Sequence, residues 1–247
     1  MSRFVALPTI TDDSALGGST IERSLRFNGS DTYIQRTSSG GNRRTWTVSF
    51  WAKFCDSSAT TNQRFWSCDG NSGNYDMLKI EFYGGTDSSR QIAIIDQGHA
   101  GNGIRFTLKR KFRDSSAWYH FVFAQDSTQS TASERMKIYV NGVRETEFLD
   151  NSTHNHPPDQ NYQGNVNATG KTNTWGRSFS FGSGSGDYLD GYLANINFID
   201  GAQLDPSYFG YTEFQTKAWR PKKFDKSDIP NSPTTTYSNT FTASGDG

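Results

Sequence analysis

The sequence is poor in features that would assign it to several classes of protein. It has two cysteines among 247 residues, Cys55 and Cys68. Two thiols cannot build a disulfide framework or complete a zinc site, so we expect both to be free. No run of 18 apolar residues occurs, which argues against a transmembrane helix. The first residues lack the apolar stretch of a signal peptide, so we expect a protein that is not secreted.

Charge of one sign is also missing, because 25 Lys and Arg balance 25 Asp and Glu. A neutral chain has no overall attraction to nucleic acid or to anionic membranes, so we expect neither as a partner. Residues typical of helices are scarce, with three methionines in the whole chain. Phe, Tyr and Trp instead make up 14% of the residues, and Gly occurs 24 times. Aromatic residues favour pleated sheets and glycine favours turns, so the composition predicts an all-β protein.

The segment from Thr45 to Phe54, TWTVSFWAKF, has the clearest strand pattern in the chain. One face carries Trp46, Val48, Phe50, Ala52 and Phe54. The other face carries Thr45, Thr47, Ser49, Trp51 and Lys53. Because alternate side chains of a strand point to opposite faces, the first set is predicted to face a core and the second to face solvent.

Residues 136–148, MKIYVNGVRETEF, predict a β-hairpin. Apolar and polar side chains alternate up to Val140, which is the period of a half-buried strand. Asn141 and Gly142 then supply two residues that tolerate positive φ angles, as a type I′ turn requires. Val143 is therefore expected to begin a second strand that runs in the opposite direction.

Residues 118–126, WYHFVFAQD, are apolar on both faces, which is typical of a central strand. His120 stands among these aromatic side chains and is expected to be a core histidine. Many short strands with regular turns and no long helix predict an antiparallel sandwich of two sheets. The regular pattern spans residues 24–210, so residues 1–23 and 211–247 are predicted to be extended terminal arms.

The two arms hold scattered apolar residues in place of a regular pattern. These are Phe4, Val5, Leu7, Phe214, Trp219 and Phe224. Segments with so few apolar positions cannot build a core of their own, so they become ordered only by packing on another surface. We expect Phe4, Leu7, Trp219 and Phe224 to dock onto neighbouring subunits. The alternative is that both arms cover their own sandwich.

No catalytic constellation is recognisable in the sequence. A sandwich glucanase needs paired carboxylates on one strand, and Glu145 and Glu147 have that spacing. They follow a tight turn, however, and are expected to face solvent. His154 and His156 precede two prolines and lack an obvious third ligand, so no metal site is assigned. Motifs of serine hydrolases, zinc proteases and phosphate-binding loops are also absent, so we do not expect an enzyme.

Residues 150–175 are rich in Asn, His, Pro and Gly and have no hydrophobic period. A long irregular loop inside a compact domain is usually functional or disordered. A glycan site would use exposed aromatic rings that stack on sugars. The candidates that lie in or beside loops are Tyr162, Trp175 and Tyr188. The alternative is that these rings pack locally under the loops.

The order of five segments resembles the laminin-G-like branch of the concanavalin A-like jelly rolls. These segments are SLRFNGSDTYIQRT, TWTVSFWAKF, SAWYHFVFAQD, ERMKIYVNGVRETEF and YLDGYLANINFIDGAQL, within residues 24–209. RDSSAWYHFVFAQDSTQSTASERMKIYVNGV, FIDGAQLDPSYFG and WRPKKF are further similar to versions of this domain in virion proteins of marine tailed bacteriophages. There the domain belongs to tail fibres, receptor-binding parts or capsid-surface proteins.

This resemblance implies a non-enzymatic structural or adhesive role, at the surface or in a tail fibre of a phage virion that is assembled in the host cytoplasm. An adhesive role would include host attachment. The expected partners are other virion subunits and further copies of the chain. The alternative is a carbohydrate-binding module that recognises host-surface glycans. A lectin-like sandwich also raises the question of calcium, for which the sequence offers Asp69, Asp76, Asp187 and Asp190. Their spacing matches no known calcium loop, so no cofactor is assigned.

Overall fold

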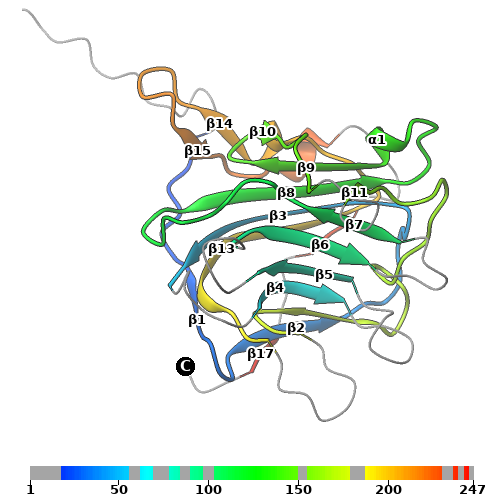
Figure 1. Cartoon of the computed structure of the whole chain (residues 1–247), viewed down its shortest axis with the longest axis horizontal. Helices are drawn as coiled ribbons and strands as arrows, with labels where there is room; N and C mark the ends of the chain where they lie inside the picture. The colour runs from blue at the N-terminus through cyan, green and yellow to red at the C-terminus, as the bar shows by residue number, and fades with distance from the viewer. Residues whose placement is uncertain are drawn as a thin grey trace, which may run out of the picture.

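The computed structural model of the chain is a sandwich of two antiparallel sheets with a small hairpin beside them (Figure 1). The structure describes residues 18–55, 62–68, 78–83, 90–96, 103–149, 155–178, 187–229, 236–238 and 242–244. Its strands are, in chain order, β1 (Leu25–Asn28), β2 (Tyr33–Thr37), β3 (Thr45–Phe54), β4 (Gln63–Cys68), β5 (Leu78–Phe82), β6 (Ile92–Asp96), β7 (Ile104–Thr107), β8 (Tyr119–Asp126), β9 (Met136–Val140), β10 (Val143–Arg144), β11 (Asn155–His156), β12 (Thr172–Trp175), β13 (Asp190–Asp200), β14 (Gly210–Thr212), β15 (Trp219–Pro221), β16 (Thr236–Ser238) and β17 (Thr242–Ser244).

The strand order confirms the predicted two-sheet sandwich. The seven-stranded sheet runs β1-β13-β3-β8-β9-β10, with β16 paired to β13. The eight-stranded sheet runs β11-β7-β6-β5-β4-β12-β2-β17. Strand β8 lies between β3 and β9, which confirms the prediction of a central strand. The helical elements of the described residues are short: α1 (Ala132–Arg135), η3 (Pro206–Tyr208) and η4 (Lys226–Asp228). None of the helices described is long and apolar enough to cross a membrane.

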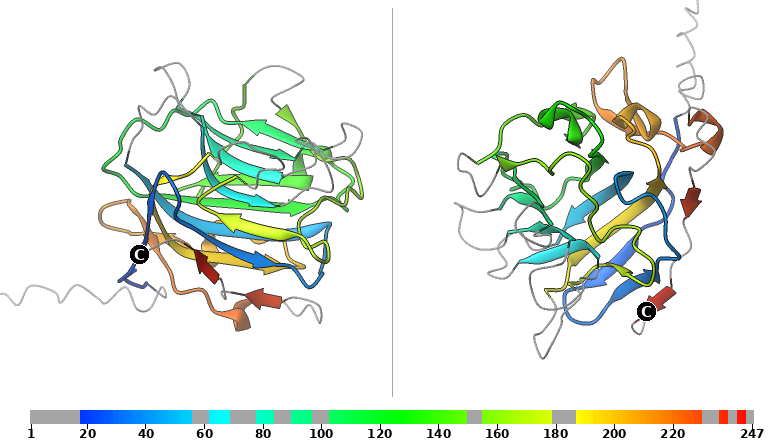
Figure 2. Two further views of the ribbon diagram at one scale, coloured as in Figure 1. Left: turned by 90° about the horizontal axis from the view of Figure 1, so that it is seen from below. Right: turned by 90° about the vertical axis from the view of Figure 1, so that its right-hand side faces the viewer.

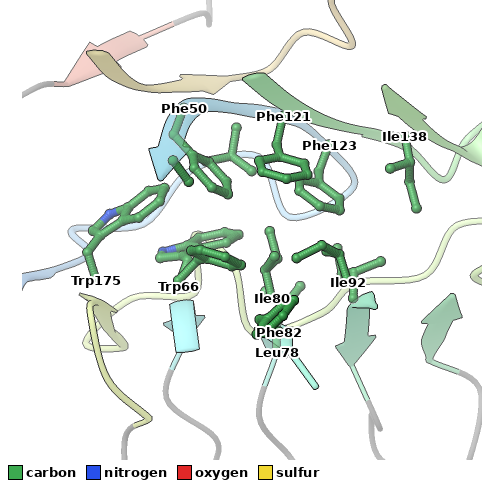
Figure 3. Close-up of a cluster of buried hydrophobic side chains, with 14 of the residues drawn as sticks. Phe50, Trp66, Leu78, Ile80, Phe82, Ile92, Phe121, Phe123, Ile138 and Trp175 are labelled. Atoms are coloured by element: carbon green, nitrogen blue, oxygen red, sulfur yellow. The ribbon is translucent and has the colours of Figure 1, made fainter. Parts of the chain in front are cut away.

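The core lies between the two sheets and is largely aromatic (Figure 3). The predicted inner face of β3 is confirmed, since Trp46, Val48, Phe50, Ala52 and Phe54 are each at most 1% exposed. The Phe50 ring lies 5.5 Å from that of Phe121 in its own sheet. It also lies 5.6 Å from the Phe65 ring and 5.3 Å from the Trp175 ring of the opposite sheet. Phe50 therefore joins both layers of the sandwich.

The outer face of β3 differs from the prediction that it faces solvent. Thr47 and Ser49 are fully buried, and Trp51 is 7% exposed. Residues 201–229 cover this face (Figure 2) and form a second apolar cluster against it. Thr47 tolerates burial because the covering segment satisfies its hydrogen bonds, whereas Ser49 bonds to His120 of the neighbouring strand. The Thr47 hydroxyl donates to the carbonyl oxygen of Ala202 at 2.7 Å and accepts from the Leu204 backbone N–H at 2.9 Å.

The C-terminal segment is therefore not a free extended arm. Trp219 and Phe224, which were expected to dock onto neighbouring subunits, lie against their own sandwich. Phe224 stacks on Phe209 with ring centroids 5.2 Å apart. For these residues the alternative of a self-covering arm is correct, because the outer face of the seven-stranded sheet needs apolar cover. Phe214, at 80% exposed, remains outside this contact.

Other parts of the predicted arms also pair with the folded domain or lie outside the described residues. Within the C-terminal segment β14 pairs with β15, while β16 and β17 extend the two large sheets. Residues 18 and 19 lie against the same segment, since Gly18 bridges to Lys222. Phe4, Val5 and Leu7 lie outside the described residues.

The hairpin at Asn141 and Gly142 is confirmed. Val140 of β9 pairs with Val143 of β10, which leaves a two-residue turn. Asn141 and Gly142 have φ angles of 48° and 79°, and a type I′ turn requires both angles to be positive. The Asn141 side chain also fixes the turn on the sheet, because its Oδ1 accepts from the His120 backbone N–H at 2.8 Å.

Replacing Gly142 with valine is expected to lower the melting temperature for two reasons, the positive φ angle of the turn and a steric overlap with Trp219. A β-branched residue in the left-handed region costs on the order of 1–2 kcal/mol. A Cβ at Gly142 would also overlap the Trp219 ring. Gly170 is the matched control, because its φ is 78° and a Cβ there meets no atom within 4 Å. Thermal melts should rank Gly142→Val below Gly170→Val, and an unchanged melting temperature for Gly142→Val would exclude the turn assignment.

Candidate functional site

An aromatic groove lies on the outer face of the seven-stranded sheet, lined in part by the β14–β15 hairpin. Figure 1 shows this hairpin at the upper left. Its cavity volume is about 300 Å³. Trp51 and Ala194 lie side by side in the register of β3 and β13 and form the floor. Trp118 forms one wall, and Trp219 with the two residues after it forms another. Residues 21–24 border the remaining side.

Trp219 is held in place by a buried histidine. Its indole Nε1–H donates to His120 Nδ1 at 3.0 Å. Because Nδ1 accepts this bond, the ring proton of neutral His120 lies on Nε2, which donates to the Ser49 hydroxyl oxygen at 2.9 Å. Burial lowers the pKa of His120 to about 3, so the ring is neutral at pH 7. This confirms His120 as a core histidine that orients a groove residue.

Trp51 is also rigidly placed. Its ring lies 5.0 Å from the His120 ring, at an interplanar angle of 31°. Its Nε1–H is buried and has no hydrogen-bond partner among the described residues. A buried donor without a partner is costly unless a ligand or water satisfies it. The floor of the groove thus combines an apolar ring with an unsatisfied donor.

Trp118 forms the open wall of the groove. It is 38% exposed, and its ring lies 6.3 Å from that of Tyr192. The Arg26 guanidinium lies 5.2 Å above the Tyr192 ring and supports this edge of the sheet. Glu22, Arg23 and Arg220 add charged groups to the lining. Aromatic walls with a few polar groups at the rim are typical of sites for small amphipathic ligands.

The three predicted glycan residues do not form this site. Trp175 is 1% exposed and stacks on Trp66 at 5.8 Å between the sheets, so it does not line the groove. Its predicted place in an exposed loop is corrected: Trp175 belongs to β12, within the stretch predicted to be irregular. The sequence did not predict this strand because Thr172–Trp175 shows no alternation of apolar and polar residues. Asn173 lies on the same face as Trp175. Tyr162 and Tyr188 are half-buried, and neither lines the groove.

Each aromatic residue of the groove can be noticed in the sequence, but the strand patterns did not predict that they lie together. Trp51 is a lone large aromatic residue on the otherwise polar face of a strand. Trp118 stands directly before β8 and remains partly exposed. Trp219 lies far from both in the chain. Only the fold brings the three rings together.

The candidate metal and catalytic carboxylates are engaged in ion pairs. Asp190 Oδ1 lies 2.7 Å from an Arg26 nitrogen, and Asp187 Oδ2 lies 2.7 Å from an Arg64 nitrogen. Asp69 and Asp76 lie outside the described residues. Within the described ranges, no group of three or more His, Cys, Asp or Glu side chains comes together.

The remaining candidates are placed as follows. Glu145, which was expected to face solvent, is 8% exposed, because its carboxylate accepts from Arg110 Nε at 2.7 Å. Glu147 is exposed as expected. His156 Nδ1 hydrogen-bonds the Gly103 carbonyl oxygen at 2.9 Å, and His154 is outside the described residues. Of the two cysteines, Cys55 is exposed and Cys68 is buried.

A buried charge cluster lies on the outward face of the eight-stranded sheet. The side chains of Arg64 and Glu81 are 6% and 1% exposed and form an ion pair between β4 and β5. Asp187 gives Arg64 a second partner, and Lys79 Nζ lies 3.7 Å from Glu81 Oε1. Burial, and next the Arg64 charge, lower the pKa of Lys79 to about 8. These groups pair with one another in charge, so the cluster is assigned a structural role.

Comparisons with known proteins place this architecture in a family. The family model of the concanavalin A-like lectin/glucanases superfamily matches residues 28–205. A search of curated proteins finds no match. Among solved structures, the chain is similar to a heptameric SAP-like pentraxin from Limulus polyphemus, with 16% identity, a TM-score of 0.47, and coverage of 71% of this chain and 74% of that one.

Two other solved structures have a similar sequence identity and TM-score to this chain. Tailspike protein 2 of bacteriophage CBA120 is 15% identical with a TM-score of 0.49, over 79% of this chain and 27% of that one. The CBM40 of Ruminococcus gnavus IT-sialidase, bound to α2,3 sialyllactose, is 12% identical with a TM-score of 0.44, over 73% and 92%. The match of the family model covers most of the chain. The chain therefore belongs to the concanavalin A-like lectin/glucanases superfamily.

Proposed function

We propose that this chain is a non-enzymatic carbohydrate-binding module of a tailed-phage virion, which holds host-surface glycans in the aromatic groove. The observation that carries the proposal is the arrangement of Trp51, Trp118 and Trp219 around one cavity of about 300 Å³. Sugar rings have apolar C–H faces that pack on aromatic rings and hydroxyl groups that hydrogen-bond to a polar rim. The groove offers both kinds of contact.

The groove is also preorganised for binding. Trp219 is fixed by its hydrogen bond to His120, and Trp51 is fixed by packing against the same ring. Side chains that are already immobile lose little conformational entropy when a ligand binds, so more of the contact energy appears as affinity.

Binding without hydrolysis fits the composition of the groove. Glycoside hydrolysis usually needs two carboxyl groups that flank the scissile bond. Among the described residues that line the groove, Glu22 is the single carboxylate. The buried Glu81 and Glu145 form ion pairs with arginines on other surfaces. We therefore propose recognition of the glycan alone.

The virion location rests on the sequence resemblance of the RDSSAWYHFVF, FIDGAQLDPSYFG and WRPKKF segments. In the structure, WRPKKF closes the outer face of the seven-stranded sheet, and Phe214 projects beside it as an exposed apolar side chain. Exposed aromatic residues of this kind are suited to contacts with other subunits. Antibody labelling of purified particles should find the chain at the virion surface. Particles that lack the chain would contradict this location.

Replacing Trp118 with alanine is expected to weaken glycan binding by about tenfold, since one open stacking surface is lost. Because Trp118 is partly exposed, the melting temperature should change little. A glycan array would first identify the ligand, and titration calorimetry would then compare the wild type with the variant. Phe214→Ala is the matched control, because Phe214 is 80% exposed and does not line the groove. Equal affinities for wild type and Trp118→Ala would exclude the groove as the site.

A further inference from the structure

A second hollow lies between the two sheets and shares no lining residue with the groove. We call it the slot, and its volume is about 60 Å³. Its described lining includes Arg36, Ser38, Trp66, Asn173, Trp175 and Phe198. The groove lies on the outer face of the seven-stranded sheet, whereas the slot opens on its inner side. The two sites are therefore separate.

The floor of the slot is apolar and rigid. Trp66 and Trp175 are each 1% exposed and stack 5.8 Å apart at an interplanar angle of 24°. Phe198 lies 6.0 Å from Trp66 and comes from the opposite sheet. An apolar group of a ligand that reaches this floor would be shielded from water on several sides. Removing apolar surface from water in this way favours binding.

The mouth of the slot carries polar groups with unused hydrogen-bonding capacity. Asn173 Oδ1 is buried and has no hydrogen-bond partner among the described residues. Arg36 is paired with Asn173 in the register of β2 and β12, so its side chain stands next to that amide. The Ser38 hydroxyl accepts from the Gly40 backbone N–H at 3.1 Å, which leaves its O–H free to donate elsewhere. The mouth thus offers the Asn173 amide oxygen as an acceptor, and the Arg36 guanidinium and the Ser38 hydroxyl as donors.

One wall of the mouth is held by a hydrogen-bonded network. Asp200 Oδ1 accepts from the Asn42 backbone N–H and from Asn167 Nδ2, both at 2.8 Å. Asn167 Nδ2 also donates to the Asn42 carbonyl oxygen at 2.9 Å. Gly41 allows this wall to close, since a Cβ there would overlap the Asp200 carboxylate. The shape of the slot is therefore set before any ligand arrives.

We propose that the slot binds the acetamido group of a 2-acetamido sugar. A volume of 60 Å³ accommodates about four water-sized groups, and an acetamido group has four non-hydrogen atoms. Its methyl group lies on the indoles of Trp66 and Trp175. Its N–H donates to Asn173 Oδ1, and its carbonyl oxygen accepts from Ser38 or Arg36. This ligand satisfies the unpaired acceptor and fills the apolar floor at the same time.

The rest of the sugar has room outside the slot. A wider hollow of about 340 Å³ adjoins it, and the two share Gly40 and Asn167 in their linings. Arg43, Thr169 and Lys171 line this hollow and are suited to hydroxyl or carboxylate groups of the sugar. The slot would be a second glycan site of this chain, and its assignment rests on the proposed function because its ligand is also a glycan.

Saturation-transfer NMR tests the proposal with two probes, the methyl glycoside of N-acetylglucosamine and methyl glucoside. We expect the acetyl methyl protons to receive the strongest saturation, because they lie on the two indoles. Methyl glucoside should show at least tenfold weaker binding, because it lacks the amide and the methyl group. Equal saturation of both probes, or none for the acetamido sugar, would overturn the proposal.

The variant Asn173→Leu removes the acceptor at nearly constant volume and is expected to weaken binding of the acetamido probe at least tenfold. Trp118→Ala, which alters the groove alone, should leave this signal unchanged. Conversely, Asn173→Leu should keep the glycan affinity of the groove, so failure of one site is distinguishable from failure of the other. If the Leu variant does not fold, shifts of the Trp66 and Trp175 indole N–H resonances on titrating the wild type with the acetamido probe decide the question. Their absence would likewise overturn the assignment.

Discussion

Replacing Phe50 with alanine is expected to lower the free energy of unfolding by about 3–5 kcal/mol. Phe50 is fully buried, and its ring contacts aromatic rings of both sheets. Its removal would leave a cavity that neighbouring rigid rings cannot fill, since close-packed interiors relax only partly. Urea denaturation monitored by tryptophan fluorescence measures the loss. Val143→Ala is the control, because Val143 is 60% exposed and should change stability by about 0.5 kcal/mol or less.

Trp51→Ala extends this experiment to the opposite face of the same strand. A solvated face would tolerate the substitution, but Trp51 is 7% exposed and packs against His120. We therefore expect a loss of a few kcal/mol, of the same order as for Phe50→Ala. A loss of less than about 1 kcal/mol would show that residues 201–229 do not cover this face in solution.

Replacing Glu81 with glutamine is expected to destabilise the protein by about 3 kcal/mol, because it leaves the Arg64 charge buried with a weaker set of partners. The side chains of both residues are at least 94% buried, and the remaining partner, Asp187, is 36% exposed. Chemical denaturation of the variant at neutral pH measures this loss. A change within about 0.5 kcal/mol would contradict the burial of an intact pair.

A double variant separates the loss of the pair from the cost of an isolated charge. Arg64→Met with Glu81→Leu replaces both ions by apolar side chains of similar length. Because the desolvation of two ions then disappears together with their attraction, the double variant should regain most of the stability that Glu81→Gln loses. If the double variant were less stable than Glu81→Gln, the attraction within the ion pair would exceed the cost of desolvating its two charges.

Local sequence patterns predicted several elements correctly. The alternation in Thr45–Phe54 identified the inner face of β3, since strand side chains repeat every two residues. Asn141 and Gly142 identified their turn, because few residue pairs tolerate two positive φ angles. In such cases the decisive physics lies within a few residues of the chain.

Other features could not be predicted in this way. Trp175 was expected in an exposed loop, yet it packs on Trp66 and Phe50 in the core. Trp219 and Phe224 were expected to contact other subunits, yet they cover their own sheet. Each of these side chains has its main partners far away in the sequence. A periodicity of two reports which face a side chain occupies and not what covers that face.

The sequence by itself determined the all-β class, the inner face of the central strands and the position of the tight hairpin, because these depend on backbone preferences and local alternation. Only the tertiary structure decided that the outer face of β3 is buried and that Trp51, Trp118 and Trp219 meet in one groove. The physical reason is that burial and site formation depend on which distant segment lies over a sheet. Here residues 201–229 return across the sheet, and hydrogen bonds to Thr47 and His120 hold them there.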